Sequence, residues 1–216
     1  ADSLMNLYFT CDSGWNGGDG AYSLLLPDDR ILWWFGDSFF GTVGPGRNRD
    51  GNRNTMVRNA FLVQENLYSP NFRALNPGFL KNTQSLLKYK DCDESERWYW
   101  PLGVTVCGNQ VHMVLMRMKK VGEGTWGFAS EAVDLAVFSL PELRLTAMVY
   151  DKCPGDVSYG SAILEDDDGY TYMYGSSRTG LLTHLHVARV HGNNLTADWE
   201  FLDVDGWQSA PSRYAI

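Results

Sequence analysis

Short apolar runs of strand length, separated by turn residues, dominate the pattern of hydrophobic and polar positions along the chain. Their period of about two predicts β-strands, and no stretch shows the repeat of a long amphipathic helix. The predicted strands are 4–9, 21–26, 31–35, 58–63, 85–89, 100–106, 111–118, 133–138, 143–150, 159–164, 170–174, 184–190 and 199–204. Residues 44–54, and the rest of 66–97, are predicted to be irregular.

Three of these strand pairs are joined by recognisable hairpin turns, at Pro27-Asp28-Asp29, Gly108-Asn109 and Asp167-Asp168-Gly169. Each hairpin is followed by further strands, so four-stranded antiparallel units recur along the chain. Such recurrence predicts an all-β fold, a β-propeller that is five-bladed when complete. We expect one incomplete domain, 1–216, with blade units at about 19–90, 98–151 and 156–207 and the start of a further blade at 208–216.

The first hairpin carries a carboxylate at each open end, Asp19 before its first strand and Asp37 after its second. With a two-residue turn at Asp28-Asp29, Asp19 would face Ser38 and Asp37 would face Gly20. The two aspartates would then lie within roughly 4.5–8 Å of each other, as cross-strand neighbours do. The alternative is that both are ordinary residues of strand ends, where Asp is common.

Aligning the three units on their turns shows that these acids are exceptions. The position of Asp19 is Tyr99 in the second unit and Ser158 in the third, and the position of Asp37 is Arg117 and Ser176. All these positions are polar, although the strands between them are apolar. A scaffold role would not require an acid in only one blade, so the pair is a candidate functional site.

Composition narrows the classes of function. Hydrophobic residues make up 44%, aromatic residues 13%, and the formal net charge is −8. This acidic balance argues against a nucleic-acid partner, which needs a basic face. No apolar run is long enough for a spanning helix, and the four cysteines match no zinc spacing, so no metal or other cofactor is predicted. Structural thiols and one disulfide both remain open.

Paired carboxylates fit glycoside hydrolysis, in which one acts as general acid and the other as nucleophile or base. Aromatic side chains near the predicted strand starts could stack on sugar rings; the candidates are Trp15, Trp98, Trp100 and Tyr159. Packing within a blade is an equally good interpretation for each. Arg117 and Arg178 could bind a carboxylate or a hydroxyl-rich ligand, or could form surface ion pairs.

The stretches GGDGAYS…ILWWFGDSFFG, RNAFLV and WPLGVTV resemble five-bladed β-propeller proteins of the glycosidase type. The closest likeness is to bacterial families first catalogued as domains of unknown function, some linked to arabinan-type glycan cleavage. The resemblance implies that Asp19 and Asp37 are the catalytic pair and that Asn59 belongs to the substrate site. Related families also use a glutamate from a later blade as general acid, for which Glu96 is the nearest candidate.

The sequence thus predicts a glycoside hydrolase that acts on a carbohydrate polymer or oligosaccharide. The alternatives are a non-catalytic glycan-binding propeller and, with less support, a protein-interaction propeller. A glycan substrate leads us to expect a secreted or periplasmic protein.

Overall fold

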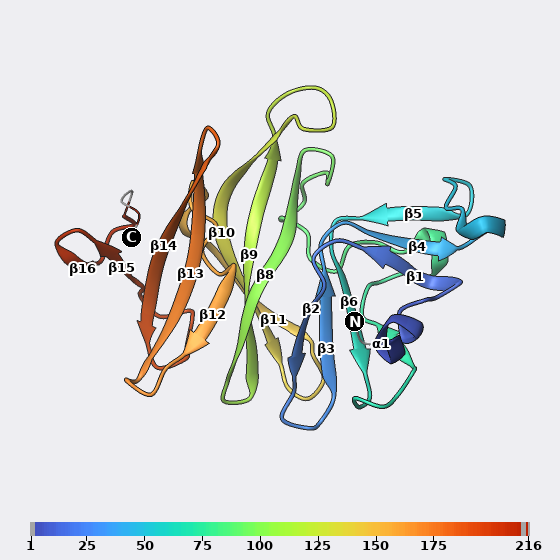
Figure 1. Ribbon diagram of the computed structural model, residues 1–216, viewed down its shortest axis with the longest axis horizontal. Coiled ribbons are helices and arrows are strands. Elements are labelled where there is room, and N and C mark those ends of the chain that lie inside the picture. The colour runs from blue at the N-terminus through green and yellow to red at the C-terminus, as the bar shows by residue number, and fades with distance from the viewer. Residues whose placement is uncertain (1–2, 213–214, 216) are drawn as a thin grey trace. The chain divides into compact units, whose positions relative to one another are not determined.

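The computed structural model describes residues 3–212 and residue 215. They form sixteen strands, one short α-helix and two 3-10 helices, so the chain is all-β (Figure 1). The strands make four antiparallel sheets of three to five strands. The chain divides into two compact units, the first comprising residues up to Glu94 with Trp98–Trp100, the second Ser95–Arg97 with the residues from Pro101 onward. Among the described residues, no helix is long and apolar enough to span a membrane.

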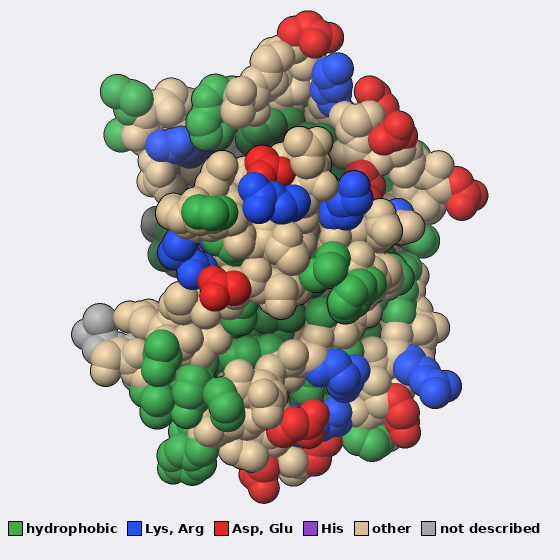
Figure 2. All heavy atoms as spheres, turned by 90° about the vertical axis from the view of Figure 1, so that its right-hand side faces the viewer, with side chains coloured by type: hydrophobic (Ala, Val, Ile, Leu, Met, Phe, Trp, Pro, Cys, Tyr) green, Lys and Arg blue, Asp and Glu red, His purple; other side chains and the backbone are tan. Residues whose placement is uncertain are grey.

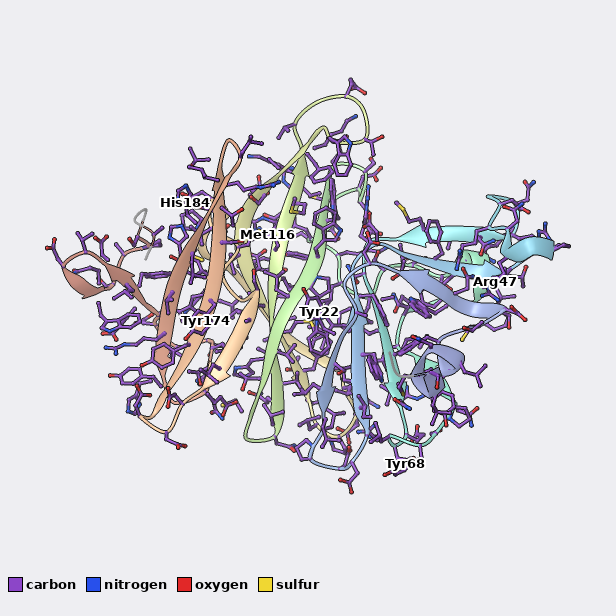
Figure 3. All side chains as sticks on the ribbon, in the orientation of Figure 1. Tyr22, Arg47, Tyr68, Met116, Tyr174 and His184 are labelled. Atoms are coloured by element: carbon purple, nitrogen blue, oxygen red, sulfur yellow. The ribbon has the colours of Figure 1, made fainter. Side chains whose placement is uncertain are left out.

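The first unit contains two sheets, of order β2-β3-β6-β7 and β1-β4-β5. Its elements are α1 (Ser3–Tyr8), β1 (Ser13–Gly18), β2 (Tyr22–Leu25), β3 (Ile31–Phe35), β4 (Ser38–Thr42), η1 (Pro45–Arg47), β5 (Asn54–Val57), β6 (Ala60–Gln64), β7 (Phe72–Ala74) and η2 (Leu80–Asn82). The four-stranded sheet is a propeller-like blade. Strands β4 and β5 belong to the other sheet, in which β4 pairs with both β1 and β5. Arg47 lies at the far end of this second sheet (Figure 3).

An aromatic core holds the first unit together. The buried side chains of Trp15, Phe35, Phe40 and Leu62 form its centre. Phe9, which follows α1, packs edge-on against Trp15 with ring centroids 5.7 Å apart. The high aromatic content is therefore used here for packing, because each such side chain buries a large apolar area.

The second unit contains two propeller-like sheets, of order β11-β10-β9-β8 and β12-β13-β14-β15-β16. Its strands are β8 (Arg97–Cys107), β9 (Gln110–Lys120), β10 (Phe128–Ser139), β11 (Leu145–Pro154), β12 (Ala162–Glu165), β13 (Tyr170–Thr179), β14 (Leu182–His191), β15 (Glu200–Asp203) and β16 (Gly206–Gln208). Residues Trp98–Trp100 of β8 belong to the first unit. Residues 111–118 of β9 are buried on both faces of the strand, which explains their nearly continuous apolar run.

The predicted all-β fold of antiparallel, propeller-like blades is confirmed. The predicted bounds of the blade units stay a prediction. Strand β16 pairs back on β15, within the third blade. Residues 213, 214 and 216, in the predicted start of a further blade, lie outside the described residues. Five blades in the complete protein stay a prediction.

Several local predictions were wrong. Residues 4–9 are not a strand but largely helix α1, because a short apolar run does not separate helix from strand. Residues 85–89 form no strand, and the irregular stretch 66–97 contains β7. Residues 13–18, for which no strand was predicted, form β1.

The register of the first hairpin was wrong by one residue. Its loop has three residues rather than two, because the Leu26 N–H donates to the Arg30 carbonyl and closes the loop around Asp28. Asp29 takes a φ of 66°, a conformation that Asp tolerates better than most residues. An odd loop length shifts every cross-strand partner by one, and Tyr22 on β2 (Figure 3) consequently pairs with Trp34.

Candidate functional site

In the first unit the chain passes between the two sheets three times, from β1 to β2, from β3 to β4 and from β5 to β6, and these three short connections lie side by side (Figure 1). The register of the flanking pairs, Tyr22 with Trp34 and Gly18 with Ser38, places Asp19 directly opposite Asp37. The pairs Phe35 with Ala60 and Ser38 with Val57 likewise place Arg58 opposite Asp37. The ladder is irregular at this level, because the Asp19 N–H donates to the Asp37 carbonyl whereas the Asp19 carbonyl accepts the Gly36 N–H, both at 2.9 Å.

Hydrogen bonds fix this row of Asp19, Asp37 and Arg58. The Asp19 backbone N–H donates to the Asp37 carbonyl at 2.9 Å. Arg58 Nη1 donates to Asp37 Oδ2 at 3.1 Å, and the indole Nε1 of Trp100 donates to Asp37 Oδ1 at 2.9 Å. Both carboxylate oxygens of Asp37 therefore receive a hydrogen bond, yet 23% of the side chain is exposed. The side chain of Asp19 is exposed.

Two indole rings flank the row. The guanidinium carbon of Arg58 lies 4.3 Å from the ring centroid of Trp98, a cation–π distance. Trp98 and Trp100 pack edge to face at 6.0 Å. A Cβ atom at Gly36 would lie 3.6 Å from Trp100 Cδ1 and 3.9 Å from Asp19 Cβ, so Asp19 and Trp100 approach the same side of Gly36. The half-buried Trp100 thus bonds to Asp37 and lies near Asp19.

Asn59 holds the tryptophan segment in place. It is fully buried, and its amide donates to the carbonyls of Leu87, at 2.9 Å, and of Tyr99, at 3.2 Å. Its Oδ1 accepts the Leu87 N–H at 2.9 Å. Tyr99 lies between Trp98 and Trp100 in the sequence, so the Asn59 side chain positions both tryptophans by holding Tyr99. These backbone contacts occupy the Asn59 amide, which was predicted to bind substrate.

The third blade repeats the backbone geometry without the acids. The Ser158 N–H donates to the Ser176 carbonyl at 2.9 Å, as Asp19 does to Asp37. The alignment of the repeats is therefore correct at this level. Serines stand in the third blade where the first blade has two carboxylates.

Five further candidates lie away from the row or in the other unit. Trp15 is in the aromatic core of the first unit and donates to Ser38 Oγ at 3.3 Å. Glu96 and Arg178 are exposed in the second unit, Glu96 in the turn before β8 and Arg178 near the tip of the β13–β14 hairpin. Tyr159 is 1% exposed and packs on Phe201 at 5.3 Å.

Arg117, the fifth, is buried in the second unit inside a group of acids. Its guanidinium donates to Glu131 at 3.0 Å, to Asp134 at 2.9 Å and to Asp151. Asp134 is completely buried and also accepts the Asp151 N–H at 2.7 Å. A structural role accounts for all these contacts, because a buried cation must be paired.

Arg58 is the site residue that the sequence reasoning did not select. It stood next to Asn59 in the RNAFLV stretch, but its pairing with Asp37 depends on the β5–β6 strands lying beside β3–β4. Within the described residues, no group of three or more His, Cys, Asp or Glu side chains is arranged to hold a metal ion. All four cysteines are free thiols, so the disulfide is excluded.

A cavity of about 410 Å³ in the first unit does not coincide with this row. Its lining residues include none of Asp19, Asp37, Arg58, Trp98 and Trp100. The row is a surface arrangement of charged and aromatic groups, whereas the cavity is a separate, uncharged hollow. We assign the candidate chemistry to the row, because the carboxylates are there.

Comparisons with known proteins agree with the fold. The family described as "Domain of unknown function (DUF5005)" matches residues 2–216. A crystal structure from Bacteroides ovatus ATCC 8483, of a protein provisionally described as a hydrolase, is 26% identical and superposes with a TM-score of 0.84. The match covers 98% of this chain and 59% of that one, so the chain spans little more than half of the solved protein's length. No curated protein matches the chain significantly.

Proposed function

The chain belongs to the DUF5005 family, and we propose that it is the part of a glycoside hydrolase that carries the catalytic carboxylates. The observation behind the proposal is the row of Asp19, Asp37 and Arg58, with the Trp100 indole bonded to Asp37. The likeness to the solved Bacteroides ovatus protein, which is provisionally described as a hydrolase, supports hydrolysis as the reaction class. The choice of a glycan rests on the carboxylate pair and its aromatic surroundings.

The two aspartates have different surroundings, which suggests different roles. Asp37 receives charge-assisted hydrogen bonds from Arg58 and from Trp100 on its two oxygens. We assign Asp37 as the nucleophile or as the base that activates water. Asp19 is exposed, so its carboxyl group can reach a leaving-group oxygen and act as general acid.

The tryptophans supply a surface for the sugar. Trp100 is half-buried beside both aspartates, and the flat face of an indole offers apolar contact to the C–H face of a sugar ring. Arg58, held over Trp98, fixes Asp37 from the other side. Five blades, an arabinan-type glycan and a secreted or periplasmic location remain parts of the proposal.

A panel of plant and bacterial glycans, assayed for released reducing ends, tests this function. The full chain should release sugar from at least one glycan, and Asp19→Asn and Asp37→Asn should each lose that activity. Asp167→Asn, which changes an exposed turn acid, is the matched control and should keep it. Equal activity in all four proteins would exclude the aspartates as catalytic groups.

A non-catalytic glycan-binding domain is the second candidate. The ion pair between Asp37 and Arg58 favours this candidate. A carboxylate that is already paired can have the structural role of fixing the tryptophans, without taking part in a reaction. In that case the chain binds a glycan without releasing sugar, and Asp37→Asn weakens binding rather than turnover.

A further inference from the structure

The cavity of the first unit is enclosed by strands β1, β4, β6 and β7 and by the segment 76–83. Its volume, about 410 Å³, falls within the range of roughly 300–1,000 Å³ that is usual for small-ligand sites. Figure 2 shows that hydrophobic side chains gather in a hollow on this side of the first unit. None of the residues of the carboxylate row lines the cavity.

The lining combines aromatic surface with neutral polar groups. Phe72 and the 75%-exposed Phe79 contribute ring surface at the wall, whereas the buried Trp15 and Phe40 of the aromatic core form the floor. Hydroxyl and amide groups come from residues such as Asn71. Among the residues that the structure describes, no Asp, Glu, Lys, Arg or His side chain lines the cavity, although the whole chain carries a net charge of −8.

The walls are held by specific hydrogen bonds. The buried Asn76 accepts the Phe61 N–H at 2.9 Å and donates to the carbonyls of Asn59 and Gln84, both at 2.9 Å. Gly78 has a φ of 94°, and a Cβ atom there would lie 2.3 Å from the Asn82 carbonyl oxygen. Only glycine fits that position. The segment is therefore fixed before any ligand arrives, which lowers the entropic cost of binding.

We propose that this cavity binds a neutral sugar unit and so forms a second glycan site apart from the carboxylate row. A charged ligand would find no counter-charge in the lining, and a purely apolar ligand would leave polar groups such as the Asn71 amide without a partner from the ligand. A neutral sugar meets both requirements, because its C–H faces can pack on the aromatic rings while its hydroxyls bond to the polar groups.

The proposal goes beyond the proposed function, since binding in the cavity requires neither aspartate. A chain of sugars held there would be retained on the protein while another part of it reaches the carboxylates. The proposed function supplies only the choice of glycan fragments as probes. Testing the site in the Asp37→Asn protein separates binding in the cavity from turnover.

Cys11 provides a local readout, because it lines the cavity. Burial raises the pKa of its thiol, so labelling with iodoacetamide is slow enough to follow by mass spectrometry of the modified peptide. The probes are neutral oligosaccharides from arabinan, galactan, xylan and glucan, with oligogalacturonate as the charged comparison and benzyl alcohol as the apolar one. Cys92, a partly exposed thiol outside the cavity, is the internal control.

At a concentration ten times its dissociation constant, a bound neutral oligosaccharide should slow Cys11 labelling about tenfold and leave Cys92 unchanged. Ala74→Phe, an exposed lining residue enlarged into the cavity, should abolish this protection. Arg73→Phe, its exposed neighbour on β7 outside the lining, is the matched control and should retain it. Phe79→Ala removes an exposed ring of the wall and should weaken the protection without threatening the fold.

Protection of Cys11 by no neutral oligosaccharide would overturn the proposal, as would equal protection by oligogalacturonate or protection by benzyl alcohol alone. Undiminished protection in both Ala74→Phe and Phe79→Ala would also overturn it, since the sugar would then bind elsewhere. If the wild-type chain hydrolyses no glycan while Cys11 is still protected, the proposed function fails and the cavity site stands.

Discussion

Asn59→Ala should be among the most destabilising single changes in the first unit, because this one side chain makes three buried hydrogen bonds. They join it to both backbone groups of Leu87 and to the Tyr99 carbonyl. A buried hydrogen bond contributes about 1 kcal/mol net, so their loss should lower the free energy of unfolding by about 3 kcal/mol. With a denaturation slope of about 1–3 kcal/mol per molar urea, the midpoint should fall by about 1–3 M.

Urea denaturation followed by tryptophan fluorescence measures this directly, since Trp98 and Trp100 flank the anchored Tyr99. Asn52→Ala is the control, because Asn52 is exposed in the loop before β5 and its change should leave the free energy of unfolding within about 0.5 kcal/mol of the wild type. A loss below about 1 kcal/mol in Asn59→Ala would refute the reasoning. It would mean that water or neighbouring groups replace the three bonds and that Asn59 does not hold the tryptophan segment.

Three further predictions concern the second unit. Asp134→Asn should lower the free energy of unfolding by about 1.5–3 kcal/mol, because it removes the completely buried one of the three acids that pair with Arg117; thermal melting checks this against Glu123→Gln, whose side chain is 95% exposed. Burial raises the pKa of the Cys153 thiol from about 9 to about 12. As the pH rises the unfolded chain therefore loses this proton first, so the free energy of unfolding should fall between pH 9 and pH 12. Urea denaturation at a series of pH values should show a flatter fall in Cys153→Ala. Burial lowers the pKa of His112, so the unfolded chain gains the proton first and stability should fall below about pH 6.5; equal acid slopes in wild type and His112→Gln would contradict this.

The sequence predicted those features that depend on local pattern. Period-two runs and turn residues predicted the blades, and the hairpin brought Asp19 and Asp37 together even though its register was wrong by one. That error came from the loop, since a three-residue loop around Asp28 and a two-residue loop use the same residue types. The sequence pattern therefore does not show the length of the loop, because the residue with a positive φ is Asp29 and not a glycine that would mark the position.

Other features depend on contacts between segments distant in sequence. Strand β1 was missed because its glycines disfavour strands in isolation, and it forms by pairing with β4. Arg58 joins the site only because β5 pairs with β4 and β6 pairs with β3. Likewise, Trp15 in the core and Trp100 beside Asp37 look alike in the sequence, and only their neighbours separate packing from a candidate sugar contact.

Chemical rescue tests the central claim most directly, because it distinguishes a missing catalytic carboxylate from a damaged fold. On a glycan that the wild type cleaves, Asp37→Ala should release almost no sugar, and added azide should restore part of the rate by taking the place of the carboxylate. Arg58→Ala, which keeps the carboxylate, should gain nothing from azide. Sugar release by Asp37→Ala at the wild-type rate without azide would contradict the claim that this carboxylate carries the reaction.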